Sequence, residues 1–175
     1  MDNLEVASIS FREATAADCA AVARVHVRSW RESFAGVVPQ SFLDKMSVEV
    51  RAKAFEEGFS APFYRMYVAE VPGRGVVGFA DFGGAREAVG GYEGELYAIY
   101  LLPEFQRKGV GERLFRQGVE FLRRAGKSSM YLLVLEVSPY RKFYEKMGGR
   151  VVGRKEIEIE GAAYDELIYG WDSLG

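Results

Sequence analysis

Two glycines stand one residue apart in the segment QRKGVG, residues 106–111, directly after the cations Arg107 and Lys108. A strand-like run precedes this segment and a helix-like pattern follows it. Gly109 and Gly111 would let the backbone approach a ligand closely, and the free N–H groups and dipole of a helix N-terminus favour anions. The residue types and their spacing therefore predict a cradle for a pyrophosphate group at the start of a helix.

Two other glycine-rich phosphate-binding motifs, the P-loop and the dinucleotide-binding fingerprint, do not fit this segment. A P-loop requires Gly-Lys-Ser/Thr, whereas Gly111 is followed by Glu112 and Arg113. The dinucleotide-binding fingerprint requires a third glycine, and Leu114 occupies that position. A plain strand-to-helix turn with a solvated basic edge stays open as the alternative that binds no ligand.

The elements that must position this loop can be read from the apolar pattern. It predicts strands at residues 8–13, 64–71, 76–82, 95–102, 130–137, 150–160 and 164–171. Helical spacing and capping residues predict helices from Thr15 or Asp18 to about Trp30, from Pro39 to Met46, over 48–59, from about Gly109 to Arg124, and after Ser138 and Pro139. With a mobile, glycine-rich loop at 83–94, this order predicts one α+β domain with a mixed sheet.

The composition limits the classes of function. The chain has 175 residues, of which 49% are hydrophobic and 27% charged, and this suits one soluble globular domain. Its net charge of −2 argues against a protein that binds nucleic acid through bulk charge. The first residues lack a cationic head and an apolar run, so we expect no signal peptide, and we expect no membrane span.

The chain contains one cysteine and one histidine. Cys19 has no partner for an intramolecular disulfide, and we expect it to be a small buried residue in a reducing, cytoplasmic setting. His26 is expected to be a core or pocket-wall residue rather than a catalyst. Because one cysteine and one histidine offer little material for a soft metal site, no metal is expected.

Three segments carry a resemblance to a known family. ELYAIYLLPEFQRKGVGERLF resembles the acetyl-CoA-binding motif of the GNAT N-acetyltransferase superfamily, Gln/Arg-x-x-Gly-x-Gly/Ala, with Gln106, Gly109 and Gly111 in the signature positions. SPYRKFYEKMGG resembles the second motif of that family, and SISFREATAADCAAVARVHVRSW is similar to its first strand and helix. The resemblance implies a GNAT-like, mostly antiparallel sheet of about seven strands flanked by helices. It covers a single domain, 1–175, with the acetyl-CoA core at about 64–148.

The resemblance also implies how acetyl-CoA, the co-substrate, is held. The pantetheine arm is expected to pair with the backbone of the central strand at Ile99, Tyr100 and Leu101. The pyrophosphate is expected on the loop at Arg107, Lys108, Gly109, Val110, Gly111 and Glu112. One departure concerns the cofactor: where the family often has Asn, this chain has Val137 or Ser138.

Two catalytic residues follow from the same resemblance. A lysine-like amine has a pKa of about 10.4, so it is mostly protonated at neutral pH and must lose a proton before attack. Glu95, where many members carry a glutamate, is the expected general base, with a solvated carboxylate at a strand start as the alternative. Tyr144, in Phe143-Tyr144-Glu145, is the expected acid that protonates the leaving thiolate, with a core aromatic as the alternative.

Two classes of function stay open from the sequence. The first is an N-acetyltransferase that acts on a primary amine of a small molecule or a protein, and the second is a non-catalytic acyl-CoA-binding sensor module. A homodimer is common in the family. Acceptor-side residues are expected among Trp30, Phe34, Phe42 and the glutamates Glu156, Glu158 and Glu160, which form either a solvated edge or a rim for a cationic or neutral amine.

Overall fold

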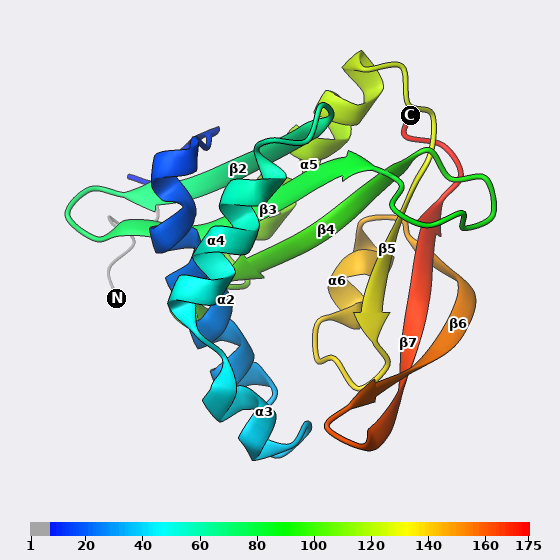
Figure 1. Ribbon diagram of the computed structural model, residues 1–175. Coiled ribbons are helices and arrows are strands. Elements are labelled where there is room, and N and C mark those ends of the chain that lie inside the picture. Colours follow the sequence, from blue (N-terminus) through cyan, green and yellow to red (C-terminus); the bar gives the residue numbers. More distant parts are fainter. Residues whose placement is uncertain (1–7) are drawn as a thin grey trace.

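A seven-stranded sheet runs through the structure, a computed structural model that describes residues 8–175 (Figure 1). The strands are β1 (Ser10–Glu13), β2 (Tyr64–Val71), β3 (Gly75–Gly84), β4 (Gly94–Leu101), β5 (Met130–Leu135), β6 (Arg150–Ile159) and β7 (Ala162–Trp171). They lie in the order β1-β2-β3-β4-β5-β7-β6, and every neighbouring pair is antiparallel except β4 with β5. The predicted mixed, mostly antiparallel sheet is confirmed.

Helices cover both faces of this sheet (Figure 1). They are α2 (Cys19–Ser33), α3 (Gln40–Lys45), α4 (Val48–Gly58), α5 (Val110–Arg124) and α6 (Arg141–Lys146), with short 3-10 turns η1 (Ala16–Asp18) and η2 (Pro103–Phe105). Helices α2 and α4 lie on one face, α5 and α6 lie on the other, and α3 extends toward the turn between β6 and β7. Ser47 caps α4 as predicted, because its hydroxyl accepts a hydrogen bond from the Val50 N–H at 3.2 Å.

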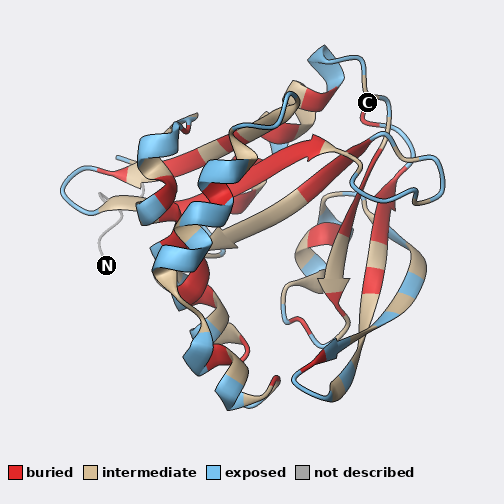
Figure 2. Cartoon of the chain, in the orientation of Figure 1, coloured by how far each residue is buried: buried red, intermediate tan, exposed pale blue. Residues whose placement is uncertain are grey.

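The apolar residues form three clusters that follow this layering. The largest cluster, which includes Phe82, Leu114 and Leu132, lies between the sheet and α5. The second cluster, which includes Val22, Phe55 and Phe79, lies under α2 and α4. The third cluster, which includes Phe34, Leu43 and Leu135, joins α2 and α3 to the β5–β7 side. Figure 2 shows β3 mostly buried, β4 buried only at its start, and the outer strand β6 exposed or intermediate along nearly all of its length. Within the described part of the chain, no helix is long and apolar enough to cross a membrane.

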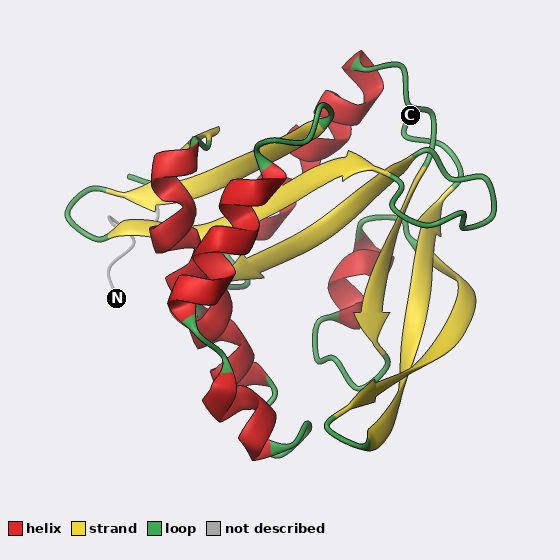
Figure 3. Cartoon of the chain, in the orientation of Figure 1, coloured by secondary structure: helices red, strands yellow, loops and turns green. Residues whose placement is uncertain are grey.

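The sheet opens between its two parallel central strands. Strands β4 and β5 pair only at Gly94↔Met130 and Glu95↔Tyr131, and beyond these residues they separate (Figure 3). A β-bulge in β4 contributes to the opening, because Asp81 pairs with Ala98 and Phe82 with Leu96, which leaves Tyr97 as the extra residue. Bulges bend a strand and increase its twist, so β4 turns away from β5.

Several predicted boundaries differ from the structure by one to three residues, and two of them concern β5 and α6. Strand β5 ends at Leu135 rather than at 137, and α6 begins at Arg141 instead of directly after Ser138. The Ser138 hydroxyl accepts from the N–H of Tyr140, only two residues on, at 3.3 Å. Pro139 and Tyr140 therefore form a turn before the helix, and the predicted cap at Ser138 was wrong because a local side-chain turn competed with the helix. The expectation of no signal peptide rested on residues 1–11, of which 1–7 lie outside the described range.

A carboxyl group is buried within the sheet. Asp81 on β3 is 4% exposed; it accepts a hydrogen bond from the Tyr64 hydroxyl at 3.0 Å, and its second oxygen has no hydrogen-bond partner among the described residues. Burial raises the pKa of Asp81 to about 7, although the bond from Tyr64 and the charge of Arg86 act in the opposite direction. This carboxyl therefore changes charge near neutral pH.

Candidate active site

The loop that begins α5 has the geometry of an anion cradle. Gly109 is the N-cap with φ +80°, and Arg107 also has a positive φ of +58°. The first backbone bond of the helix runs from the Arg113 N–H to the Gly109 carbonyl at 3.1 Å. Within residues 8–175, the N–H groups of Val110 and Gly111 make no backbone hydrogen bond, as expected for a first helical turn.

Glycines serve different purposes at the two positions of this loop. A Cβ added to Gly111 would lie 3.3 Å from a Leu101 methyl carbon and 3.4 Å from the Phe143 ring, so glycine allows α5 to pack tightly between β4 and α6. A Cβ added to Gly109 would meet nothing within 4 Å, and its positive φ is what favours glycine there.

The edge of β4 that faces the opening is available to a ligand at alternate residues. The Leu102 N–H bonds to Val77 on β3 at 2.9 Å, so by antiparallel alternation the backbone of Tyr100 also bonds to β3, whereas Ile99 and Leu101 turn toward the opening. The Leu101 carbonyl already accepts from Ser29 at 3.1 Å and from Gln106 at 3.2 Å. Of the three predicted pantetheine positions, Ile99 and Leu101 thus face the opening with their backbone, and Tyr100 contributes its side chain.

A cavity of about 110 Å³ lies in the opening and reaches both faces of the sheet. Its walls come from β4 at residues 96–100 and from β5 at residues 132–135. On the α5 and α6 side it is bounded by Tyr144 and by apolar residues of the largest core cluster. On the α2 side it is bounded by Trp30 and Phe34 and by residues of the final hairpin. The cavity therefore has residues from both faces of the sheet in its walls.

Tyr144 points its ring into this cavity from α6. The side chain is 7% exposed, and its hydroxyl makes no hydrogen bond to any described residue. Burial, and then the nearby Tyr100 and Tyr140, raise the pKa of the Tyr144 hydroxyl above its ordinary value, so the group keeps its proton at neutral pH. The role of Tyr144 as the acid beside the leaving group stays a prediction.

A second tyrosine from the same region connects the two sides. The Tyr140 hydroxyl forms hydrogen bonds with Ser33 on α2 and with the Gln106 side chain, the latter at 3.2 Å. Gln106 also bonds to the Leu101 carbonyl, so the first residue of the loop motif joins β4 to the start of α6. Of the two residues at the place where the family often has Asn, Ser138 is buried and lines the cavity, whereas Val137 is 48% exposed.

The α2 side of the cavity is aromatic and apolar. Trp30 stacks on Phe34 at 4.4 Å between ring centroids, and its indole N–H donates to the Tyr100 hydroxyl at 2.9 Å. His26 packs behind Tyr100 at 4.9 Å, and burial lowers the pKa of His26 to about 3, which keeps the ring neutral. His26 does not itself line the cavity, so of the predicted core and pocket-wall positions it occupies the core one. Phe42 packs against Trp30 but does not line the cavity.

Glu95 lies at the closed end of the opening, where β4 and β5 pair. The residue is 1% exposed, and its carboxylate accepts from the backbone and side chain of Arg86, at 2.6–3.1 Å, and from the Tyr131 hydroxyl at 2.8 Å. Glu95 does not line the cavity, although Leu96 and Tyr97 do. The carboxylate therefore holds the loop at 85–93 against the sheet, and the role of general base stays a prediction.

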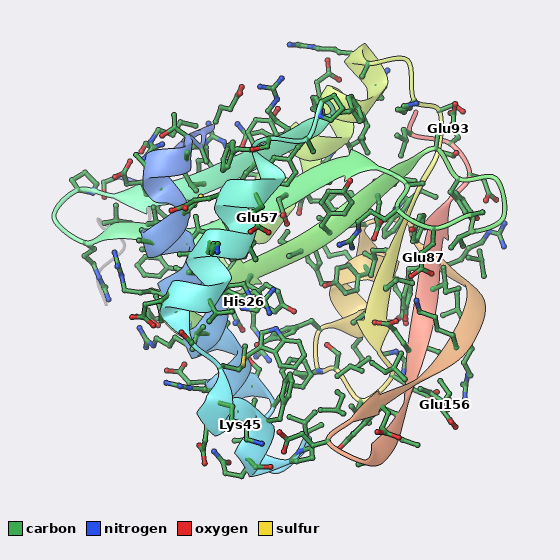
Figure 4. The ribbon with its side chains drawn as sticks, in the orientation of Figure 1. His26, Lys45, Glu57, Glu87, Glu93 and Glu156 are labelled. Carbon is green, nitrogen blue, oxygen red and sulfur yellow. The ribbon has the colours of Figure 1, made fainter. Side chains whose placement is uncertain are left out.

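The glutamates of the final hairpin, expected as a solvated edge or as an acceptor rim, lie outside the cavity. Glu156 and Glu158 are exposed, and Figure 4 shows Glu156 at the outer edge of the sheet. Glu160 lies in the β6–β7 turn and pairs with Lys45 of α3 at 2.7 Å. None of the three lines the cavity, whereas Glu166 of β7 does. The solvated-edge alternative fits Glu156 and Glu158.

The two sides of the site and the sheet between them define the class of protein. A mixed sheet that opens between two parallel central strands, with a free helix N-terminus beside the opening, is the arrangement of a GNAT-type acyltransferase. Residues 21–149 match the model of the Acetyltransferase (GNAT) family. That match covers more than half of the chain, so the protein belongs to the GNAT family and is an N-acetyltransferase.

Individual relatives agree with this assignment. Over 167 residues the chain is 38% identical to the uncharacterized N-acetyltransferase YuaI of Bacillus subtilis (strain 168), an alignment covering 95% of this chain and 94% of YuaI. The fold is similar to YncA of Salmonella typhimurium, solved with its cofactor acetyl-CoA, with a TM-score of 0.71, 22% identity, and 95% and 94% of the two chains covered. It is also similar to the PaiA N-acetyltransferase of Thermoplasma acidophilum in complex with coenzyme A, with a TM-score of 0.66, 21% identity, and 91% and 98% covered.

Proposed function

We propose that the protein transfers an acetyl group from acetyl-CoA to a primary amine. The observation that carries the proposal is the cavity that reaches both faces of the sheet, with the free start of α5 on one side and an aromatic wall on the other. An amine that arrives from the α2 side would meet a thioester held between β4 and β5. In this geometry acetyl-CoA and the amine would bind on opposite sides of the sheet, and their reacting groups would meet in the cavity between the strands.

The residues of this chain fit acetyl-CoA in two places. The N–H groups at the start of α5, together with the charges of Arg107 and Lys108, would bind the pyrophosphate. The backbone groups of Ile99 and the N–H of Leu101, which face the opening, would pair with the pantetheine arm, since the Leu101 carbonyl already accepts two hydrogen bonds. Because backbone groups would make most of these contacts, the apolar side chains of the same residues remain available to pack in the core.

The reaction joins the amine nitrogen to the acetyl carbon and breaks the bond from that carbon to sulfur. The thioester is already activated, so the protein must remove one proton from the ammonium and stabilise the departing thiolate. Tyr144 is placed to donate its hydroxyl proton to the sulfur in a hydrogen bond that strengthens as negative charge develops. Its raised pKa keeps that proton available across neutral and mildly alkaline pH.

A matched pair of glycine variants tests the cradle. Gly109 and Gly126 flank opposite ends of α5, have φ of +80° and +78°, and would each place a Cβ with no neighbour within 4 Å. Alanine at either position should therefore cost a similar ~1–2 kcal/mol of backbone strain. Only Gly109→Ala should also weaken CoA binding, by roughly tenfold or more, in a calorimetric titration. Wild-type CoA affinity in a folded Gly109→Ala protein would remove the cradle assignment.

Turnover is the second test of the proposal. Acetyl-CoA is supplied with a panel of small amines and N-terminal peptides, and the release of free thiol is recorded. Acceptor-dependent thiol release supports a transferase, whereas CoA binding without release on any acceptor supports a sensor module. The glycine pair separates these outcomes from simple misfolding, because Gly126→Ala should behave as the wild-type protein in both assays.

A further inference from the structure

The charged residues of the cavity are distributed unequally between its two sides. Among the described residues that line it, Glu166 is the one charged group, and no arginine or lysine lines it. Glu166 lies on the α2 side, because it pairs directly with Leu135 across the β5–β7 ladder and paired residues share a face. The side that receives the acceptor therefore presents a carboxylate in an otherwise aromatic and aliphatic wall.

The immediate surroundings of Glu166 leave this side with a net negative charge. The carboxylate is 17% exposed and lies 3.5 Å from the ammonium of Lys155, its cross-strand partner. That ammonium is shared, since it lies closer to Glu87, at 3.0 Å (Figure 4 labels Glu87 over the β5–β7 side). Two carboxylates and one ammonium give a local charge of −1. Arg86 and Glu95, the next ion pair along the opening, neutralise each other.

We infer that the acceptor is a small primary amine on an apolar body and that it carries no carboxylate beside the amine; this rests on the proposed transferase function. An ammonium is attracted to Glu166, while Trp30, Phe34 and Ile157 offer apolar surface to the rest of the molecule. A carboxylate on the acceptor would be repelled by Glu166 and would find no cation in the cavity wall to pair with. The small volume, about 110 Å³, favours acceptors of a few carbon atoms over large ones.

Three acceptors that differ at one group test this inference. Isoamylamine, leucine and leucinamide share the same apolar body, and they carry, beside the amine, a hydrogen, a carboxylate and an uncharged amide. We expect kcat/KM for isoamylamine and leucinamide to exceed that for leucine by at least about tenfold, because a close pair of like charges in a partly buried site costs at least that factor. Leucine used as well as isoamylamine, or better, would overturn the inference.

Variants of Glu166 identify the group responsible. Glu166→Gln keeps the shape and should lower kcat/KM for isoamylamine by about 10- to 100-fold with little effect on leucine, and Glu166→Lys should shift the preference toward leucine. Glu156→Gln is the matched control, since Glu156 is an exposed glutamate of the same hairpin and should leave all three values unchanged. Equal effects of Glu166→Gln on isoamylamine and leucine would also overturn the inference.

Failure of the inference and failure of the proposed function are distinguishable. CoA titration of each variant reports whether the fold and the cradle persist, independently of the acceptor. Thiol release with leucine but not with isoamylamine contradicts the inference and leaves the transferase intact. Thiol release with none of the amines in the panel, from a protein that binds acetyl-CoA, contradicts the transferase and the inference together.

Discussion

Replacing Glu95 by glutamine removes a buried charge that joins β4 to the loop at 85–93. The two carboxylate oxygens accept four hydrogen bonds, three from Arg86 and one from Tyr131. A glutamine offers one acceptor oxygen, and its NH2 group would face N–H or O–H donors that it cannot satisfy. The substitution therefore leaves at least one buried donor without its partner.

The expected loss of stability can be bounded from these contacts. Removing one partner of a fully buried ion pair costs about 3–5 kcal/mol, and a hydrogen bond to a charged group is worth about 1.5–3 kcal/mol. The Arg86 side chain is 58% exposed and can return to water, so solvent screening reduces its share. We expect Glu95→Gln to lower the free energy of unfolding by about 2–3 kcal/mol. For a chain of this size, that lowers Tm by roughly 4–10 °C.

Thermal unfolding, with thiol release recorded in parallel, is the assay. Glu120→Gln is the control, because Glu120 forms exposed ion pairs with Arg123 and Arg124 on α5 and should change stability by less than about 0.5 kcal/mol. A Glu95→Gln protein that unfolds at the wild-type Tm would refute the structural reasoning. If Tm is unchanged and kcat falls by about 10²–10⁴-fold, Glu95 acts as the general base instead.

Three further predictions concern the cavity, the buried carboxyl and the packing of α5. Tyr144→Phe should lower kcat by about 10²–10³-fold with unchanged CoA affinity by calorimetry, and wild-type turnover would exclude the hydroxyl as proton donor. Burial raises the pKa of Asp81 to about 7 in the folded protein, whereas the pKa of this carboxyl in the unfolded chain is about 3.9. Between these two pH values the folded protein holds a proton that the unfolded chain releases. The free energy of unfolding therefore falls as the pH rises from about 4 to 7. Asp81→Asn should remove this slope, so that its Tm advantage over the wild type grows from pH 5 to pH 8, and a pH-independent difference would contradict the assignment. Gly118→Ala should cost at least about 1–3 kcal/mol in urea unfolding, because the added methyl overlaps the buried Phe82 ring; an unchanged midpoint would show that the ring can move aside.

Local chemistry made much of the fold predictable from the sequence. Strand β2 has the predicted bounds, Tyr64–Val71, because its alternation and the flanking turn residues act over a few residues. The same holds for the cap at Ser47 and for the glycine that begins α5, whose positive φ follows from its place between a loop and a helix. The family resemblance then supplied the mostly antiparallel pairing and the approximate number of strands, whereas the strand order β1-β2-β3-β4-β5-β7-β6 came only from the structure.

Parts of the site depend on contacts between distant residues and were not predictable in this way. Glu166 reaches the cavity only because β7 inserts between β5 and β6 and pairs it with Leu135, whereas the sequence drew attention to the more conspicuous Glu-Ile-Glu-Ile-Glu run. Arg86 was assigned to a mobile loop, and its pairing with Glu95 depends on how that loop folds back onto the sheet. Alternation along the run from Glu156 to Glu160 did predict two exposed glutamates, but it gave no information on which strand face closes the cavity.

The two residue pairs that join β4 to β5 have a consequence for the cooperativity of the native state. So few shared backbone bonds connect the two halves of the sheet that each half can open without breaking the hydrogen-bond ladder of the other. Native-state hydrogen exchange should then resolve two sets of amides, one on β2 and β3 and one on β5 and β7. A ligand that contacts both halves, present at a concentration of 100 times its Kd, should slow hydrogen exchange in both sets of amides by about 100-fold, wherever exchange requires an opening that disrupts the ligand site. Because only two residue pairs join β4 to β5, hydrogen exchange at amides distant from the site should report whether the site is occupied.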